Sequence, residues 1–430
     1  MSFRNLFVAL TFCLLGLFFS DVAVAGVPGD ETLKAGFAKA DITPDMAVEL
    51  YGYAVRKKLS EGIHDPLSVR VSAFENGGKK FVLVSSDLGA YGTAVASVFR
   101  ESIMDKYDLK DSELFLSTIH SHSSPRLTVD PSTGNPNNIE YTKKVQQVLL
   151  DAIGKALKDM KPVLTGVGKG SSPVGSNRRE MDANGEIIIG RNPYGPADKE
   201  VLVMKVTRLD NAPVAAVFDY ATHSTSLGPG NLQVSGDVLG LASQFVEKIL
   251  GKDVIAPVFA GASANIDPWY RVLPGFNTES GWIPEPVLLG TLLGEEVVHV
   301  FRSINDTKPG GTINTAFEIL ECPRKNKAAN ADTNSGAETV PVRITVARIG
   351  DDLAFVGFSV EMLTEIGMEI KSASPFKNTF IITHCNGASG YLPPSELYKE
   401  GGYEVSSSQF AIGSSDMVVK KTLRMLYDLK

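Results

Sequence analysis

The chain has 430 residues, of which 43% are hydrophobic and 21% charged, and its formal net charge is −7. This apolar content excludes a wholly disordered chain, and the length is ample for a large buried core. The negative charge and the absence of any run of five basic residues argue against nucleic acid or an anionic membrane surface as a partner. We therefore expect a globular protein whose ligand is neutral or weakly charged.

The first 25 residues have the pattern of a cleaved export signal. Arg4 gives a positive start, the stretch Leu6–Phe19 is apolar, and Ala23–Ala25 fits a small-residue cleavage site. Because the apolar stretch is short for a bilayer span, we expect no stable membrane insertion. The predicted organisation is a signal peptide over residues 1–25 and a single domain over residues 26–430, exported to the periplasm or secreted.

Cysteines do not organise the fold. Removal of the predicted signal peptide removes Cys13 and leaves only Cys322 and Cys385. In an exported protein these two residues are compatible either with one disulfide or with two separate buried thiols.

Short β-rich runs alternate with amphipathic stretches along the rest of the chain. The predicted strands are Phe81–Ser85, Leu114–Ile119, Val201–Val206, Pro213–Phe218, Val254–Ala260, Val342–Ile349, Ala354–Phe358 and Thr379–Thr383. The predicted helices are Gly92–Tyr107, Glu140–Met160, Val238–Leu250, Pro286–Ile304 and Asp416–Leu429, the last with Ser415 as its cap. This alternation predicts an α/β fold in which mixed β-sheets are layered with outer helices.

Four of the six histidines directly follow or end a predicted strand: His120, His122, His223 and His384. His120 and His122 stand two residues apart, so their side chains project to the same side if the strand continues. Neutral imidazole is a common metal ligand and titrates near working pH, so the pair predicts a metal or proton-transfer site. Hydrogen-bonded turn histidines are an equally good interpretation of this pair alone. By contrast, His299 lies inside a predicted helix and is expected to pack there.

Other strand ends carry similar chemistry. His223 follows the run that ends at Phe218, Glu361 follows the run that ends at Phe358, and Tyr391 lies beyond the run that ends at Thr383. Ligand sites in open α/β sheets gather beyond the carboxyl ends of strands. We therefore expect these side chains to converge with His120 on one site.

Several longer motifs occur in a characteristic order. They are Ala40–Pro44, Tyr51–Ala54, Gly62–Leu67, His120–Pro125, Asn177-Arg178, Thr222–Ser226, Ser235–Asp237 and Asn386–Tyr403. In order and spacing, these motifs resemble the catalytic domain of the neutral/alkaline non-lysosomal ceramidase family, zinc-dependent hydrolases of an N-acyl amide bond. The resemblance covers most of the chain after residue 25.

The resemblance implies a role for individual residues. It places the Zn²⁺ ligands at His120, His223, Glu361 and Tyr391, with one coordination position open to a water molecule that attacks the amide. It implies that His122 exchanges a proton during catalysis and that Tyr403 and Arg178 lie at the reacting centre as donors to the developing oxyanion. Through the same resemblance, Gly52 and His64 are expected to contact substrate.

Asp267 departs from the family pattern. It lies in the segment Phe259–Pro268 at the position where the family's Gly-Asp-x-Ser-Pro element has its serine. An ionised carboxylate accepts hydrogen bonds but does not donate them, and it can bind a substrate hydroxyl, an amine or a second cation. The β-rich C-terminal domain of the family would lie beyond Lys430. Asp267 is therefore expected to contact substrate and to alter specificity.

The function predicted from sequence is that of an exported, zinc-dependent amidohydrolase of lipid metabolism. Its substrate would be ceramide or another small or lipid-like N-acyl compound. Two alternatives stay open: a zinc esterase or acyl hydrolase of a smaller substrate, and a non-catalytic exported binding protein that zinc stabilises.

Overall fold

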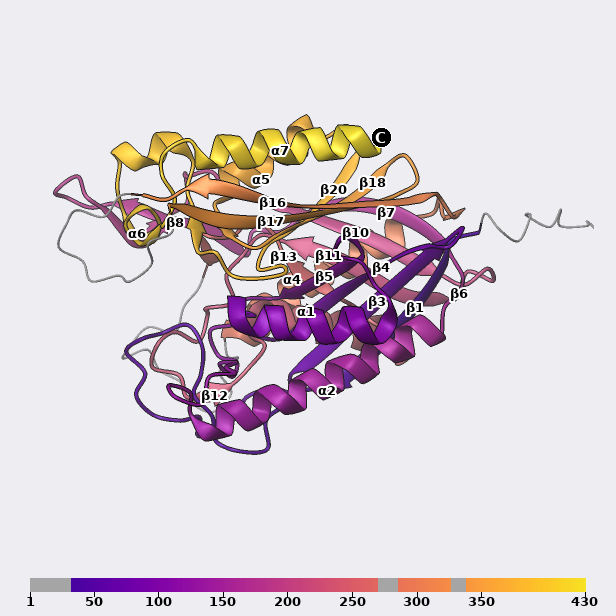
Figure 1. The fold of residues 1–430 in the computed structure, drawn as a ribbon, viewed down its shortest axis with the longest axis horizontal. Coiled ribbons are helices and arrows are strands. Elements are labelled where there is room, and N and C mark those ends of the chain that lie inside the picture. Colours follow the sequence, from indigo (N-terminus) through magenta and orange to yellow (C-terminus); the bar gives the residue numbers. More distant parts are fainter. Residues whose placement is uncertain (1–31, 270–284, 326–337) are drawn as a thin grey trace, which may run out of the picture.

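The computed structural model describes residues 32–269, 285–325 and 338–430 (Figure 1). Within these ranges, three larger sheets form most of the β-structure. The first has the order β5 (Leu114–Thr118), β4 (Lys79–Ser86), β3 (Ser68–Asn76), β1 (Lys34–Asp41), β6 (Lys161–Pro162). The second has the order β13 (Val258–Ala260), β11 (Pro213–Tyr220), β10 (Glu200–Thr207), β7 (Leu164–Ser171), β15 (Lys308–Pro309). The third has the order β16 (Ile313–Pro323), β17 (Thr339–Ile349), β18 (Leu353–Phe358), β20 (Asn378–Ile382).

Smaller sheets and the helices complete the described structure. The small sheets pair β12 (Gln233–Val234) with β2 (Gly62–Ile63), β14 (Ile266–Pro268) with β8 (Gly175–Met181) and β9 (Ile187–Asn192), and β19 (Glu361–Met362) with β21 (Tyr391–Leu392). The α-helices are α1 (Thr93–Tyr107), α2 (Pro136–Lys158), α3 (Asp237–Leu250), α4 (Glu285–Ser303), α5 (Thr364–Ala373), α6 (Tyr403–Ser407) and α7 (Ser414–Leu429).

The three larger sheets share one apolar core. Buried aromatic side chains from all three meet in it, among them Phe81, Phe115, Phe259, Phe355 and Phe380. The outer faces are covered by helices: α1 and α2 on the first sheet, α3 and α4 on the second, α5 and α7 on the third. Figure 1 shows α7 along one side of the molecule and α1 and α2 along the opposite side. Strands β5, β18 and β20 are buried along their whole length and have largely apolar sequences, which explains why they were predictable.

Each larger sheet contains one parallel strand pair joined through a helix: β4–α1–β5, β11–α3–β13 and β18–α5–β20. The carboxyl ends of these pairs meet, since the Thr383 N–H donates to Ala260 O (2.9 Å) and the Asn386 N–H donates to Leu116 O (2.8 Å). Residues that follow strands in three different sheets are therefore brought to one place.

The predicted α/β class is confirmed, and each predicted helix and strand overlaps an observed one. Two details were wrong. The last helix begins at Ser414 after Gly413, whose positive φ of 91° suits glycine, so Ser415 is not its cap. His299 is exposed on α4 instead of packed, because it lies on the outward face of that helix.

Other parts of the predicted organisation have different outcomes. Cys322 and Cys385 are both buried free thiols, so the alternative of a disulfide between them is wrong. The predicted signal peptide lies outside the described residues, and the division into signal and single domain stays a prediction. Among the helices that the structure describes, none combines the length and apolar character needed to span a bilayer.

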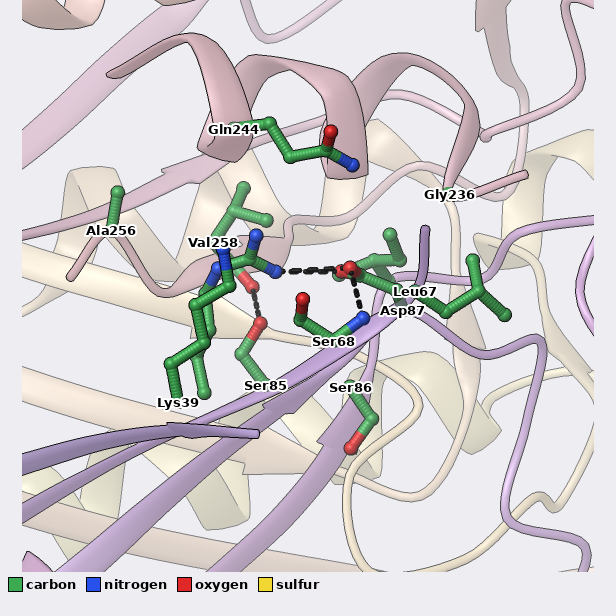
Figure 2. Close-up of polar contacts among 12 residues, drawn as sticks. Lys39, Leu67, Ser68, Ser85, Ser86, Asp87, Gly236, Gln244, Ala256 and Val258 are labelled. Carbon is green, nitrogen blue, oxygen red and sulfur yellow. Dashed lines mark hydrogen bonds and ion pairs between the residues drawn. The ribbon is translucent and has the colours of Figure 1, made fainter. Parts of the chain in front are cut away.

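A buried ion network joins β3, the end of β4 and α3. Arg70, with no exposed surface, donates through Nη1 to both oxygens of Asp87 (3.0 Å each) and through Nε to Glu247 Oε1 (2.7 Å). Figure 2 shows the Asp87 carboxylate beside Ser68, whose backbone N–H donates to Asp87 Oδ2 (2.8 Å). Lys39 adds a partly exposed contact to Glu247 Oε2 (2.6 Å). The network holds the turn that begins at Asp87 against helix α3.

Replacing Arg70 by methionine is expected to destabilise the fold by about 3–5 kcal/mol, because it leaves the buried Asp87 carboxylate without the cation that pairs with it and leaves Glu247 with only the partly exposed Lys39. Chemical denaturation of the purified variant measures this change. The matched control is Lys39→Met, which removes a partly exposed cation from the same network and should cost at most about 1 kcal/mol. Equal stability of the two variants would show that the buried arginine has no special role.

Candidate metal centre

Two histidine-bearing loops, one after β5 and one after β11, are joined directly to each other. Ser121 and Ser224 form a parallel bridge, and the His122 N–H donates to Ser224 O (3.0 Å). The bridge places His120 and His223 next to each other, with ring centroids 4.8 Å apart. His120 has φ of 58°, a left-handed conformation that costs energy for a residue with a side chain and is common at functional sites.

Both of these imidazoles are oriented as metal ligands usually are. His120 Nδ1 donates to Gly89 O (3.0 Å), and His223 Nδ1 donates to Ser263 O (2.7 Å). A backbone carbonyl that accepts from one ring nitrogen leaves the other nitrogen, here Nε2, with a lone pair for a metal. Burial lowers the pKa of His223 well below its ordinary value, and the nearby Arg178 lowers it further, so this ring is neutral and able to ligate.

Glu361 and Tyr391 are brought together by strand register. They are direct partners in the parallel pair β19–β21, and the Glu361 N–H donates to Gly390 O (2.9 Å). Glu361 Oε2 lies 3.4 Å from His120 Nε2 and 3.9 Å from His223 Nε2. Burial raises the pKa of Glu361, but His120, His384 and the Tyr391 hydroxyl together bring it below its ordinary range, so the carboxylate is ionised.

These donors fit a divalent metal ion. Ligands that surround zinc tetrahedrally at 2.0–2.1 Å stand about 3.3 Å from one another, close to the observed separation of Glu361 Oε2 and His120 Nε2. Glu361 Oε2 is buried and has no hydrogen-bond partner among the described residues. An unpaired buried carboxylate oxygen is costly unless a cation compensates it. Two imidazole nitrogens and a carboxylate are donors that zinc accepts.

His122 lies against this cluster but differs from the two other histidines. Its Nε2 is 3.2 Å from His120 Nε2, and its Nδ1 is buried without a hydrogen-bond partner. It therefore lacks the carbonyl that orients His120 and His223, although its distance alone would also allow it to ligate. Gly52, with φ of 100°, packs against the His122 ring, where a Cβ atom would come within 2.3 Å of Cγ. Gly52 thus makes room for His122, and its predicted contact with substrate stays a prediction.

Arg178 links the cluster to its surroundings. Its Nη2 donates to the Tyr391 hydroxyl (3.4 Å), and its Nη1 lies 3.3 Å from Asp267 Oδ1 and 3.5 Å from His223 Nε2. Its Nε donates to Glu404 Oε1 (2.7 Å), a carboxylate that is almost fully buried. Asp267 is also buried and accepts from Thr225 Oγ1 (3.3 Å). The residue predicted to alter specificity therefore forms an ion pair with an arginine of the cluster.

The remaining predicted residues lie farther out. The Tyr403 ring packs edge-on to Tyr391 with centroids 5.6 Å apart, and 46% of the residue is exposed, so it borders the site on the solvent side. His64 directly follows β2, and its N–H donates to Val234 O (2.8 Å). Its Nδ1 lies 2.7 Å from Asp65 Oδ1, so its ring pairs with this carboxylate and is not part of the imidazole cluster.

Sequence reasoning missed one contribution to the site. Glu404 binds both Arg178 and Arg179 Nη1 (3.0 Å to Oε2), and no local pattern marks it. His384 stacks on His120, with ring centroids 3.8 Å apart. Its position directly after a predicted strand had already marked it in the sequence, where a hydrogen-bonded turn histidine was the alternative interpretation.

Residues 33–267 match the model of a protein family described as neutral/alkaline non-lysosomal ceramidase, N-terminal. Similar proteins include a neutral ceramidase of Oryza sativa subsp. japonica, 28% identical over 49% of this chain and 28% of that protein. A neutral ceramidase of Mycobacterium tuberculosis is 26% identical over 55% of this chain and 39% of that protein. The alignments thus span well under half the length of these relatives.

Solved structures show the same fold. The neutral ceramidase of Pseudomonas aeruginosa superposes with a TM-score of 0.78 at 17% identity, over 93% of this chain and 75% of that chain. A ceramidase complexed with C2 gives a TM-score of 0.77 at 18% identity, with the same coverage. At this level of identity the likeness establishes the arrangement of the sheets and helices.

Purified protein is expected to bind about one divalent ion per chain, and His120→Ala and His223→Ala should each abolish this, because each removes a nitrogen donor. Elemental analysis after dialysis against zinc measures the stoichiometry. His299→Ala, which removes an exposed histidine on α4, is the control and should retain the ion. Unchanged metal content in both ligand variants would reject the assignment.

Proposed function

The chain belongs to the neutral/alkaline non-lysosomal ceramidase family, and on this basis we propose that it is a zinc-dependent hydrolase of the amide bond in ceramide or a related N-acyl compound. The observation that carries the proposal is the convergence of His120 Nε2, His223 Nε2 and the unpaired Glu361 Oε2. We take Tyr391, the register partner of Glu361, as the fourth protein ligand. A zinc ion held there would activate water and polarise the scissile carbonyl.

His122 is the proposed proton carrier. Burial lowers its pKa well below the ordinary value, and His120 lowers it further, so the ring is neutral and able to accept a proton. Its Nε2 lies beside His120 Nε2, where the attacking water would lose a proton. Returning that proton to the amine that leaves completes hydrolysis, in which the C–N bond breaks and a carboxylic acid forms.

Arg178 and Tyr403 are the proposed donors to the developing oxyanion. Arg178 is buried and held by Glu404 and Asp267, so its guanidinium is fixed before substrate binds. A fixed donor that meets negative charge in the transition state typically supplies about 3–4 kcal/mol. Tyr403 is partly exposed and lies where the acyl or amine part of a substrate would approach from solvent.

Asp267 is compatible with a second candidate substrate class. Its carboxylate offers an acceptor and not a donor, so a substrate with a hydroxyl or amine near the scissile bond fits better than one that must accept a hydrogen bond there. A smaller N-acyl compound or an ester meets this condition as well as ceramide does.

We further propose that the protein is exported, on the strength of the signal-like pattern in residues 1–25.

Turnover of a substrate panel tests the function. The zinc-loaded protein should hydrolyse N-acyl amides, lose activity with a chelator and regain it with zinc, as measured by release of free fatty acid. His122→Ala should retain its zinc while kcat falls by about 10²–10⁴-fold. Hydrolysis of esters alone would favour the second candidate. Zinc binding without turnover of any substrate would reject an enzymatic function and favour a binding protein that zinc stabilises.

Asp267→Ser is expected to shift selectivity toward ceramide, because serine provides a neutral hydroxyl where the family has one. The ratio of kcat/KM for ceramide to that for a short N-acyl amine measures the shift. Thr225→Val, which removes a hydrogen bond to Asp267 but keeps its charge, serves as the control. An unchanged ratio in Asp267→Ser would show that this position does not select substrate.

A further inference from the structure

We propose that His384 is a positioning residue that holds the metal-ligating imidazole of His120 in place by stacking on it. The inference rests on the proposed metal site but adds a residue that the resemblance does not assign. The two rings lie almost parallel, with centroids 3.8 Å apart and an interplanar angle of 13°. Both residues are buried, so the stack is shielded from water.

The backbone around His384 is fixed to the strand that carries His120. Asn386 Oδ1 accepts from the Leu116 N–H (3.0 Å), and Asn386 Nδ2 donates to Leu114 O (2.8 Å). Ser117 and Cys385 form an antiparallel bridge one residue after His384. These contacts join the segment after β20 to β5, so the two backbone segments that carry the stacked rings are fixed relative to each other.

Backbone strain supports a dedicated role. His384 has φ of 52°, and His120 has φ of 58°, whereas residues with side chains rarely adopt such values. Each such residue costs of order 1–3 kcal/mol and persists only where the surrounding structure imposes it. Here the same strain occurs in both members of the stack.

His384 is unsuited to be a further ligand of the same ion, although its nitrogen, a nitrogen of His120 and an oxygen of Glu361 all lie within 4.8 Å of one another. The lone pair of an imidazole nitrogen lies in the plane of its ring. The His120 and His384 rings are almost parallel and 3.8 Å apart, so their nitrogen lone pairs lie in two separate planes. An ion bound in the plane of the His120 ring, about 2.0–2.1 Å from Nε2, would therefore lie outside the plane of the His384 ring and could not accept its lone pair. The contact therefore acts on the orientation of His120.

Stacking limits rotation of the His120 ring, while the Gly89 carbonyl fixes its tautomer. Partners that orient a ligand in this way typically contribute 10–100-fold to metal affinity. An aromatic ring on a metal-bound imidazole also faces a group that carries part of the ion's positive charge, which favours the stacked arrangement.

Two replacements separate stacking from ligation. His384→Asn removes the ring but tolerates the positive φ, and zinc affinity is expected to fall about 10–100-fold. His384→Phe keeps a flat ring without a nitrogen, and affinity should stay within about threefold of wild type, with an unchanged visible spectrum of the cobalt-substituted protein. Competition with a chromophoric chelator measures affinity. The control is His299→Asn, at an exposed position of α4. If His384→Asn does not fold, His384→Gly provides the ringless arm.

Equal loss of affinity in His384→Phe and His384→Asn, with an altered cobalt spectrum, would make the nitrogen a ligand and overturn the proposal. Unchanged affinity in His384→Asn would overturn it too, because the stack would then have no effect on the metal. These outcomes are independent of substrate. If wild-type protein binds zinc but hydrolyses no amide, the proposed function fails while the role of His384 is still decided by affinity.

Discussion

A buried oxygen of an ionised carboxylate, without a hydrogen-bond partner among the described residues, is the constraint on which this structure depends. Glu361 Oε2 faces two imidazole nitrogens whose opposite ring nitrogens are already bound to backbone carbonyls. No donor from these rings is left for the oxygen, so the arrangement is stable only with a nearby positive charge. Arg178 contacts the neighbouring His223 and Tyr391, and a divalent ion would provide positive charge at the oxygen itself.

The three parallel strand pairs explain how such a constraint is met. The three units are β4–α1–β5, β11–α3–β13 and β18–α5–β20. In each of them, one position of interest lies three residues after the end of the first strand, and another lies two residues after the end of the second strand. The first positions are Gly89, His223 and Glu361, and the second are His120, Ala262 and His384. Equivalent places in three sheets therefore supply the carbonyl that accepts from His120, three of the proposed metal ligands and the ring that stacks on one of them. The same strand–helix–strand arrangement thus occurs three times, and the three copies differ in the residue at each of these positions.

The sequence predicted what depends on local pattern. Buried strands such as β5, β11 and β18 are apolar runs, and the residues that follow them were identified because parallel strands deliver their ends to a common edge. Strand β8 was missed because its sequence is polar although most of it is buried, and β9 was missed because it is short and partly exposed. The contact of Arg178 with Glu404 and the stacking of His384 depend on how separate sheets pack, which no window along the chain contains. The roles of His120 and Tyr391 came from family resemblance, and register then explained the pairing of Tyr391 with Glu361.

The bridge between Ser121 and Ser224 has a consequence for the order in which the molecule matures. It joins loops that belong to different sheets, and Glu361 arrives from a third, so the donors are scattered until all three layers have docked. Such long-range assembly is slow compared with the formation of helices. A nascent chain would therefore lack a high-affinity site for the proposed metal ion. Binding of that ion would come at the last stage of folding, where it would stabilise the docked layers by mass action.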